Sequence, residues 1–123
     1  MVSSGKISAT SAGRAGEFLT ASKLQMAGLE TTHVAGSCDL HVTLPSNRVL
    51  RVEVKAALTP SRSGSFRFHV GNSNAEVFML VSMPLRLIRI FSESDLMGKM
   101  ITLRPAEFTE QAEADDIAHL LLL

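Results

Sequence analysis

The chain has 123 residues, 46% of them hydrophobic, and its twelve Lys and Arg residues balance its twelve Asp and Glu residues. This length and apolar content predict one domain over residues 1–123 with a sizeable core, and no apolar run approaches the roughly 20 residues of a membrane span. The single Cys38 excludes an internal disulfide framework and a Cys-rich zinc site, and the first residues contain no hydrophobic signal core. We expect a soluble, cytoplasmic protein with no membrane partner.

The zero net charge hides an uneven distribution. Residues 1–70 contain eight Lys and Arg against four Asp and Glu, whereas residues 71–123 contain four against eight. A basic half could face phosphate groups while the acidic half faces water or a partner. Ordinary mixed surface charge explains the same distribution equally well.

A helix is the first expected element. Residues 1–7 are rich in Ser and are expected to be flexible, and either Ser8 or Ser11 could cap a helix that ends at Gly28. Glu17 lies on a small, partly apolar stripe of this helix, so its carboxylate need not be solvated. The stripe that we expect to face the core contains Ala15, Phe18, Leu19, Ser22 and Met26.

Two alternating runs follow, joined by a Pro-Ser-Asn loop, and they predict a β-hairpin over residues 37–58. In the second run Leu50, Val52 and Val54 share one face, so Arg51, Glu53 and Lys55 share the other. If Leu44 pairs with Arg48, or Pro45 with Val49, then Asp39 and His41 lie on the face of Glu53 and Lys55. Two carboxylates and an amine then converge.

The remaining elements are expected to be mostly strands. Residues 66–70 and 85–91 alternate, and residues 76–82 form a continuous apolar run suited to the centre of a sheet. Residues 92–99 could hold one helical turn, residues 100–103 a short edge strand, and residues 105–123 a final helix. The expected order is a helix, five strands and a helix.

The charged face of the hairpin has the composition of a phosphodiester-hydrolysing site. Asp39 and Glu53 could hold a Mg²⁺ ion together with the backbone carbonyl of Val54, since Mg²⁺ takes oxygen ligands and keeps several waters. Lys55 could orient the attacking water, stabilise its hydroxide form or offset charge on the phosphorus. The alternative without any catalytic role is a solvated strand face with cross-strand ion pairs.

The pattern resembles the PD-(D/E)XK nuclease superfamily, and within it the small Holliday-junction-resolvase-like and group I intron-associated homing endonucleases. The resemblance rests on a helix with Glu17 in GRAGE, on Asp39 followed after thirteen residues by Glu53-Val54-Lys55, on the FRF strand and on Glu76 before a buried strand. Relatives commonly have Thr or Ser at the position of Ala56. The resemblance implies an α/β, restriction-endonuclease-like fold: a central mixed β-sheet flanked by helices, with an αβββαβ-type core.

The same resemblance implies the roles of the site residues. Asp39 and Glu53 would bind Mg²⁺, for which Mn²⁺ is expected to substitute, Lys55 would assist the nucleophile, and Glu17 would reach the site from the helix. Glu17 could instead form an ion pair with Arg14. Turn chemistry also explains the loop asparagines, and Cys38 is expected to fill the core. The residues expected to contact DNA are Arg14, His41, Arg51, Arg62, Arg67, Asn72 and Asn74.

We therefore expect a metal-dependent DNA endonuclease that acts on duplex or branched DNA. The chain has no Trp or Tyr, so only Phe66 and Phe68 could stack on single strands. Cutting two strands would require a homodimer or higher homo-oligomer, which the leucine-ended tail over residues 115–123 could support. Two alternatives stay open: a non-catalytic DNA-binding or assembly protein with the nuclease fold, and a small protein-interaction module. No separate DNA-reading motif is visible, so specificity would come from residues 59–65 and 71–76 or from a second subunit.

Overall fold

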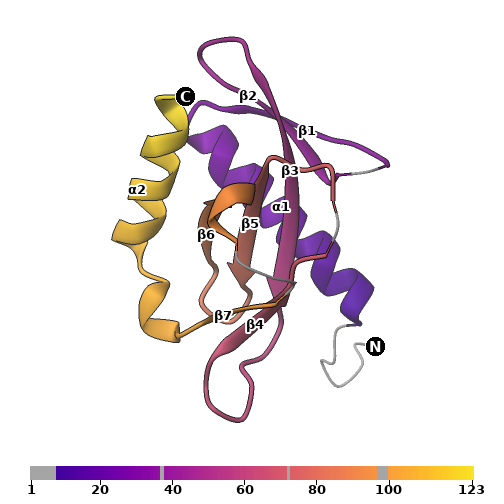
Figure 1. The fold of residues 1–123 in the computed structure, drawn as a ribbon, viewed down its shortest axis with the longest axis vertical. Coiled ribbons are helices and arrows are strands. Elements are labelled where there is room, and N and C mark those ends of the chain that lie inside the picture. Colours follow the sequence, from indigo (N-terminus) through magenta and orange to yellow (C-terminus); the bar gives the residue numbers. More distant parts are fainter. Residues whose placement is uncertain (1–7, 37, 72, 97–99) are drawn as a thin grey trace, which may run out of the picture.

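A five-stranded mixed sheet forms the centre of the structure, a computed structural model that describes residues 8–36, 38–71, 73–96 and 100–123 (Figure 1). Its strand order is β1-β2-β3-β5-β6, in which β3 and β5 are parallel and the other neighbours antiparallel. The expected α/β class, with a mixed sheet flanked by helices, is confirmed. The elements are α1 (Ala9–Met26), β1 (Glu30–His33), β2 (Leu40–Thr43), β3 (Val49–Ala57), β4 (Phe66–His69), β5 (Val77–Ser82), β6 (Leu87–Ser92), β7 (Met100–Leu103) and α2 (Glu110–Leu121), with short 3-10 turns at Glu93–Asp95 and Pro105–Glu107.

Two strands depart from the expected order. The sequence analysis missed β1 because its residues, Glu-Thr-Thr-His, are polar and mostly exposed. The expected αβββαβ-type core would place a helix between β3 and β5, but the described part of this crossover carries the strand β4. The expected flexibility of residues 1–7 concerns residues outside the described part of the chain.

Helix α1 begins and ends where the sequence indicates. The Ser8 hydroxyl accepts a hydrogen bond from the Ser11 N–H (3.1 Å), and the chain turns at Gly28 with a φ of 90°. The predicted core stripe is wrong, because Phe18 is 62% exposed and Met26 is 88% exposed. The buried residues of α1 are mostly small, namely Ala12, Gly16, Thr20, Ala21 and Leu24.

Small residues face the sheet because the helix approaches β3 very closely. A Cβ added to Gly16 would lie 2.9 Å from the Cβ of Ala56, a separation that real Cβ atoms essentially never show. A large side chain on this face of α1 would therefore push the helix away from the sheet. The large apolar residues of α1, such as Phe18 and Met26, consequently lie on another side of the helix than the one that packs on the sheet.

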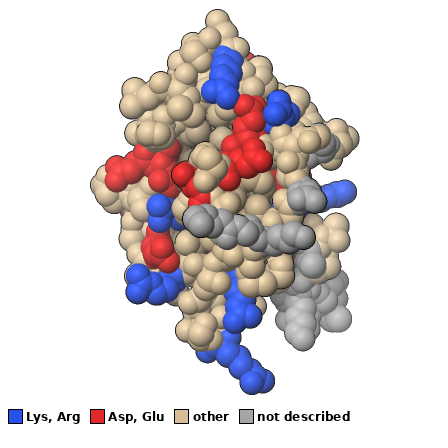
Figure 2. All heavy atoms as spheres, viewed as in Figure 1, with Lys and Arg blue, Asp and Glu red and all other residues tan. Residues whose placement is uncertain are grey.

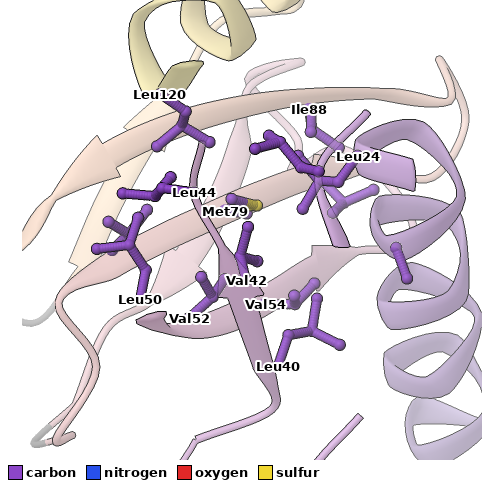
Figure 3. Packing of buried hydrophobic residues seen from close by; sticks show 14 residues of the cluster. Leu24, Leu40, Val42, Leu44, Leu50, Val52, Val54, Met79, Ile88 and Leu120 are labelled. Atoms are coloured by element: carbon purple, nitrogen blue, oxygen red, sulfur yellow. The ribbon is translucent and has the colours of Figure 1, made fainter. Parts of the chain in front are cut away.

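The register of the β2–β3 hairpin is confirmed. Leu40 pairs with Val52, and the Leu44 N–H donates to the Arg48 carbonyl at 2.8 Å. Val52 and Val54 consequently point toward α1 and pack with residues such as Leu24 and Met79, with Leu120 of α2 at the margin of the cluster (Figure 3). Glu53 and Lys55 project from the opposite face of β3.

A second apolar cluster lies on that opposite face. The strands β4 and β7 pair with each other as a separate two-stranded sheet, which we call the β4–β7 ribbon. The cluster includes Phe66, Phe68 and Leu103 of the ribbon and Leu80 of β5. Cys38 is buried, as expected for a core residue, and it lies in this second cluster because it precedes β2 and does not follow that strand's alternation.

The helix α2 covers the outer edge of the sheet at β6. The Ile88 N–H donates to Glu113 Oε2 (2.8 Å) and the Ile90 N–H donates to Asp116 Oδ2 (2.9 Å). Glu113 also accepts two hydrogen bonds from Lys23 Nζ, at 2.7 and 2.9 Å. Part of the acidic tail thus serves the fold itself. No helix in the described segments is long and apolar enough to cross a membrane.

Candidate active site

The candidate site lies beside β3, directly before β2 begins. At this point, which we call the strand gap, the Asp39 N–H still donates to the Val52 carbonyl (3.0 Å), and Asp39 Oδ2 accepts from the Val54 N–H (2.8 Å). The carboxylate thus takes the place of a neighbouring strand's carbonyl. It binds the peptide group that joins Glu53 to Val54, which brings Asp39 next to the Glu53 backbone.

The backbone carbonyl of Val54 faces the same gap. Residues of β3 alternate in the edge to which their peptide groups point, and the carbonyls of Arg51 and Ala57 accept from Glu76 and Met83 on the β5 side. The N–H and the carbonyl of Val54 therefore both point to the β2 side, where Asp39 stands.

Glu53 and Lys55 form an ion pair on the exposed side of β3. Lys55 Nζ lies 3.2 Å from Glu53 Oε2, and the Ser73 hydroxyl donates to Glu53 Oε1 at 3.0 Å. Ser73 is itself held by the Ala75 N–H, which donates to its oxygen at 3.1 Å. The Glu53 carboxylate is thereby held from two sides, while the Lys55 side chain stays more than one-third exposed.

Glu17 approaches the strand gap from α1. Burial and the nearby Asp39 charge raise the pKa of Glu17, and His33 and Arg14 oppose this rise only in part. The His33 ring approaches it, with Nδ1 3.9 Å from Glu17 Oε1, and the alternative ion pair with Arg14 does not form. Phe18 packs beside the His33 ring with centroids 4.7 Å apart.

The other predicted contact residues are dispersed. His41 pairs with Arg51 across the hairpin, on the face of Glu53. Arg51 Nε donates to the Asn74 carbonyl (2.7 Å), and Arg51 Nη1 lies 3.6 Å from Glu76. Arg14 is exposed on α1, Arg62 lies in the β3–β4 loop, Arg67 projects from β4, and Asn72 is outside the described residues.

Glu76, which precedes β5, binds Arg48 and Arg51. Burial alone would raise the pKa of Glu76, but hydrogen bonds from the Arg51 N–H and the Arg48 side chain, with the charges of both arginines, lower it. Burial and the Asp39 charge raise the pKa of the Cys38 thiol, which agrees with a filling role.

The donor set of the strand gap suits a hard cation. No group of three or more His, Cys, Asp or Glu side chains that could hold a metal ion occurs within the described residues. The expected set is different, because it combines two carboxylates with a backbone carbonyl. Asp39 uses Oδ2 for Val54 and retains Oδ1, and the Val54 carbonyl points to the same gap. Oxygen donors of this kind fit Mg²⁺ and Mn²⁺.

Comparison with known proteins shows a similarity of fold. The sequence matches no protein-family model and no curated protein. The chain shares its fold with a bacterial homing endonuclease. The solved structure of this enzyme, I-Ssp6803I, superposes with a TM-score of 0.73 over 95% of this chain and 89% of the other, at 15% sequence identity. The similarity to the homing endonuclease shows the fold, and the PD-(D/E)XK assignment stays a prediction.

Sequence reasoning missed two residues of the site. Ser73 lies between two asparagines in a polar loop, and nothing in that loop indicates contact with a residue twenty positions away. His33 was missed because β1 was missed; its only signal is its position six residues before Asp39. Both side chains touch a carboxylate that the sequence analysis had selected.

Proposed function

We propose that the protein is a metal-dependent DNA endonuclease that hydrolyses phosphodiester bonds in duplex or branched DNA. The observation that carries this proposal is the strand gap, where the Asp39 carboxylate, the Val54 peptide group and the Glu53–Lys55 pair adjoin one another. The fold shared with a homing endonuclease supports the substrate class.

Each residue has a proposed role in hydrolysis. Asp39, Glu53 and the Val54 carbonyl hold Mg²⁺, which when bound polarises a phosphate oxygen and lowers the pKa of a coordinated water. Lys55 orients the attacking water or offsets negative charge on the phosphorus, since its amine is anchored by Glu53 yet reaches solvent. Glu17 acts from α1, directly or through a water molecule, and its raised pKa suits a group that shares a proton with that water.

The assembly that would cut both strands is a homodimer or a higher homo-oligomer, because one site cuts one strand. The end of α2 stays available for such pairing even though Leu120 is buried, since Leu122 is 84% exposed. This oligomeric state stays a prediction.

A cleavage assay tests the proposal. Plasmid, linear duplex, flap and four-way-junction DNA are incubated with the protein in Mg²⁺ and in EDTA, alongside Lys55→Ala and the charge-matched control Arg86→Gln, which lies in the β5–β6 turn. We expect Mg²⁺-dependent cleavage that Lys55→Ala abolishes and Arg86→Gln retains. Full cleavage by Lys55→Ala would contradict the assignment. DNA retention without cleavage, together with no Mg²⁺ uptake in calorimetry, would favour the non-catalytic DNA-binding alternative.

A further inference from the structure

The β4–β7 ribbon has one buried face and one exposed face. Phe66, Phe68 and Leu103 point inward and are nearly inaccessible to solvent. Alternation turns the next side chains outward as two cross-strand pairs, Arg67 beside Thr102 and His69 beside Met100, and all four are exposed.

Packing holds the ribbon in place. The Phe108 ring stands edge-on to Phe66, with centroids 5.5 Å apart, and contacts Phe68 at 6.2 Å. Phe78 and Leu80 of the central sheet complete this cluster. The outward pairs are therefore displayed on a frame that is anchored to the same sheet as the strand gap.

The loop that leads into the ribbon is ordered by its own hydrogen bonds. The Ser61 N–H donates to the Ser65 carbonyl (2.8 Å), and the Gly64 N–H donates to the Ser61 carbonyl (2.9 Å). Gly64 adopts a φ of 84°, which favours glycine. This turn exposes Arg62 beyond the end of the ribbon.

The segments that form the ribbon and its loops carry a net positive charge. Residues 56–75 and 96–106 together contain four Lys and Arg and not a single Asp or Glu, namely Arg62, Arg67, Lys99 and Arg104. Because the whole chain has twelve of each sign, the remainder carries four more acids than bases. Figure 2 shows basic side chains at the end where Figure 1 places the β3–β4 loop, and acidic ones over α2.

We propose that the outward face of the β4–β7 ribbon enters the major groove of duplex DNA and reads base edges there, which rests on the function proposed above. The major groove, about 12 Å wide, admits a two-stranded β-ribbon. Alternate side chains on a strand stand roughly 7 Å apart, the rise of about two base pairs. Arg67 and His69 therefore face base pairs about two steps apart.

The chemistry of the four side chains matches groove recognition. An arginine donates two hydrogen bonds to guanine O6 and N7, and a threonine or an apolar side chain contacts the thymine methyl group. Arg62 precedes β4 and Arg104 follows β7, so both exposed arginines lie toward the end of the ribbon where Phe66 pairs with Leu103. Arg104 Nε is 4.0 Å from Glu107. From this end both arginines would contact phosphates. Single-stranded DNA is the poorer partner, because Phe66 and Phe68, the stacking candidates of the sequence analysis, are only 2% exposed.

Selection from a pool of randomised duplexes tests the proposal. The full chain, Arg67→Gln and the charge-matched control Arg86→Gln are each bound to the pool in EDTA, so that cleavage does not interfere. We expect the wild type and Arg86→Gln to select the same base pairs. Arg67→Gln should lose the preference for guanine at one position and bind the selected duplex about 10- to 100-fold more weakly, with little change on unselected duplex.

Guanine methylation provides an independent measurement. Methylation of guanine N7 in the selected duplex should block wild-type binding at the guanine that Arg67 reads, and should have no further effect on Arg67→Gln. If Arg67→Gln bound every duplex equally more weakly, Arg67 would be a phosphate contact and the proposal would be overturned. The proposal would also fail if the wild type and Arg67→Gln selected the same sequences, or if the wild type selected none. Since these measurements need no cleavage, the ribbon can fail while hydrolysis stands, and hydrolysis can fail while the ribbon stands.

Discussion

Carboxylates at two places in this protein accept hydrogen bonds from the backbone of the same sheet, yet their surroundings differ. Glu113 and Asp116, the edge carboxylates, bind the Ile88 and Ile90 N–H groups, and each has a cationic partner within 2.9 Å. Asp39 binds the Val54 N–H in the same manner, but the charged group whose pKa it raises by repulsion is another acid, Glu17, and not a cation.

The hydrogen bond from a sheet N–H to a carboxylate thus occurs in two different settings. The edge carboxylates are balanced by Lys23 and Arg89, and they satisfy N–H groups that would otherwise offer a free sheet edge to another chain. At the strand gap, Asp39 has no Lys or Arg within ion-pair distance among the described residues, and its charge raises the pKa of Glu17. A bound cation would relieve this repulsion.

Neutralising Asp39 in one variant and Asp116 in another should separate activity from stability most strongly. Asp39→Asn keeps an oxygen that accepts the Val54 N–H, so the fold should survive, but the lost charge should reduce Mg²⁺-dependent cleavage by at least about 100-fold. Asp116→Asn, the matched change at β6, should leave cleavage unchanged in the plasmid assay. Wild-type cleavage by Asp39→Asn, or loss of cleavage by a folded Asp116→Asn, would reverse the comparison.

Removing a whole edge carboxylate should destabilise the fold. Glu113→Ala leaves Lys23 and the Ile88 N–H without their partner in a half-buried setting, which should cost about 2–3 kcal/mol in urea unfolding. The control Asp115→Ala removes an exposed acid whose side chain accepts a hydrogen bond from Gln111, and should change stability by less than about 0.5 kcal/mol. Equal effects of the two changes would show that the edge carboxylates have no special role.

A smaller effect should follow from loosening Glu53. Ser73→Ala removes the hydroxyl that donates to Glu53 Oε1, so the Mg²⁺ concentration for half-maximal cleavage should rise about tenfold. The rate at saturating Mg²⁺ should change much less, and Ser73→Thr, which keeps a hydroxyl, should restore the wild-type requirement. A loss of rate that excess Mg²⁺ cannot recover would indicate a different role for Ser73.

The smallest expected effect concerns Glu17 and pH. Burial and Asp39 raise the pKa of Glu17 in the folded state, so the folded protein binds this proton more tightly than the unfolded chain does. Stability should therefore fall as pH rises from the ordinary glutamate pKa through the raised one. Glu17→Gln should be more stable than the wild type at pH 7, by about 0.5 kcal/mol or less, and equally stable in acid. Denaturant unfolding at several pH values measures the difference, and a destabilised variant at pH 7 would contradict the reasoning.

The sequence predicted those parts of the site that depend on local alternation. The register of the β2–β3 hairpin followed from its apolar pattern and its short loop, and it brought Glu53 and Lys55 to the face that was expected. The close approach of α1 was not predictable, because Gly16 and Ala56 carry no apolar signal. The β4–β7 ribbon was also not predictable, since it joins residues 66–69 to residues 100–103 through tertiary packing alone.

The contact between Gly16 and Ala56 has a consequence for how this protein can diverge. Glu17 follows the glycine and Lys55 precedes the alanine. The size of the side chains at positions 16 and 56 therefore sets the distance between α1 and the strand gap. A bulkier residue at either position would lift the helix and withdraw Glu17 from its neighbours. Substitutions at positions 16 and 56 should therefore be correlated during evolution. A protein with threonine after the motif lysine must hold its first helix at a different distance from the sheet.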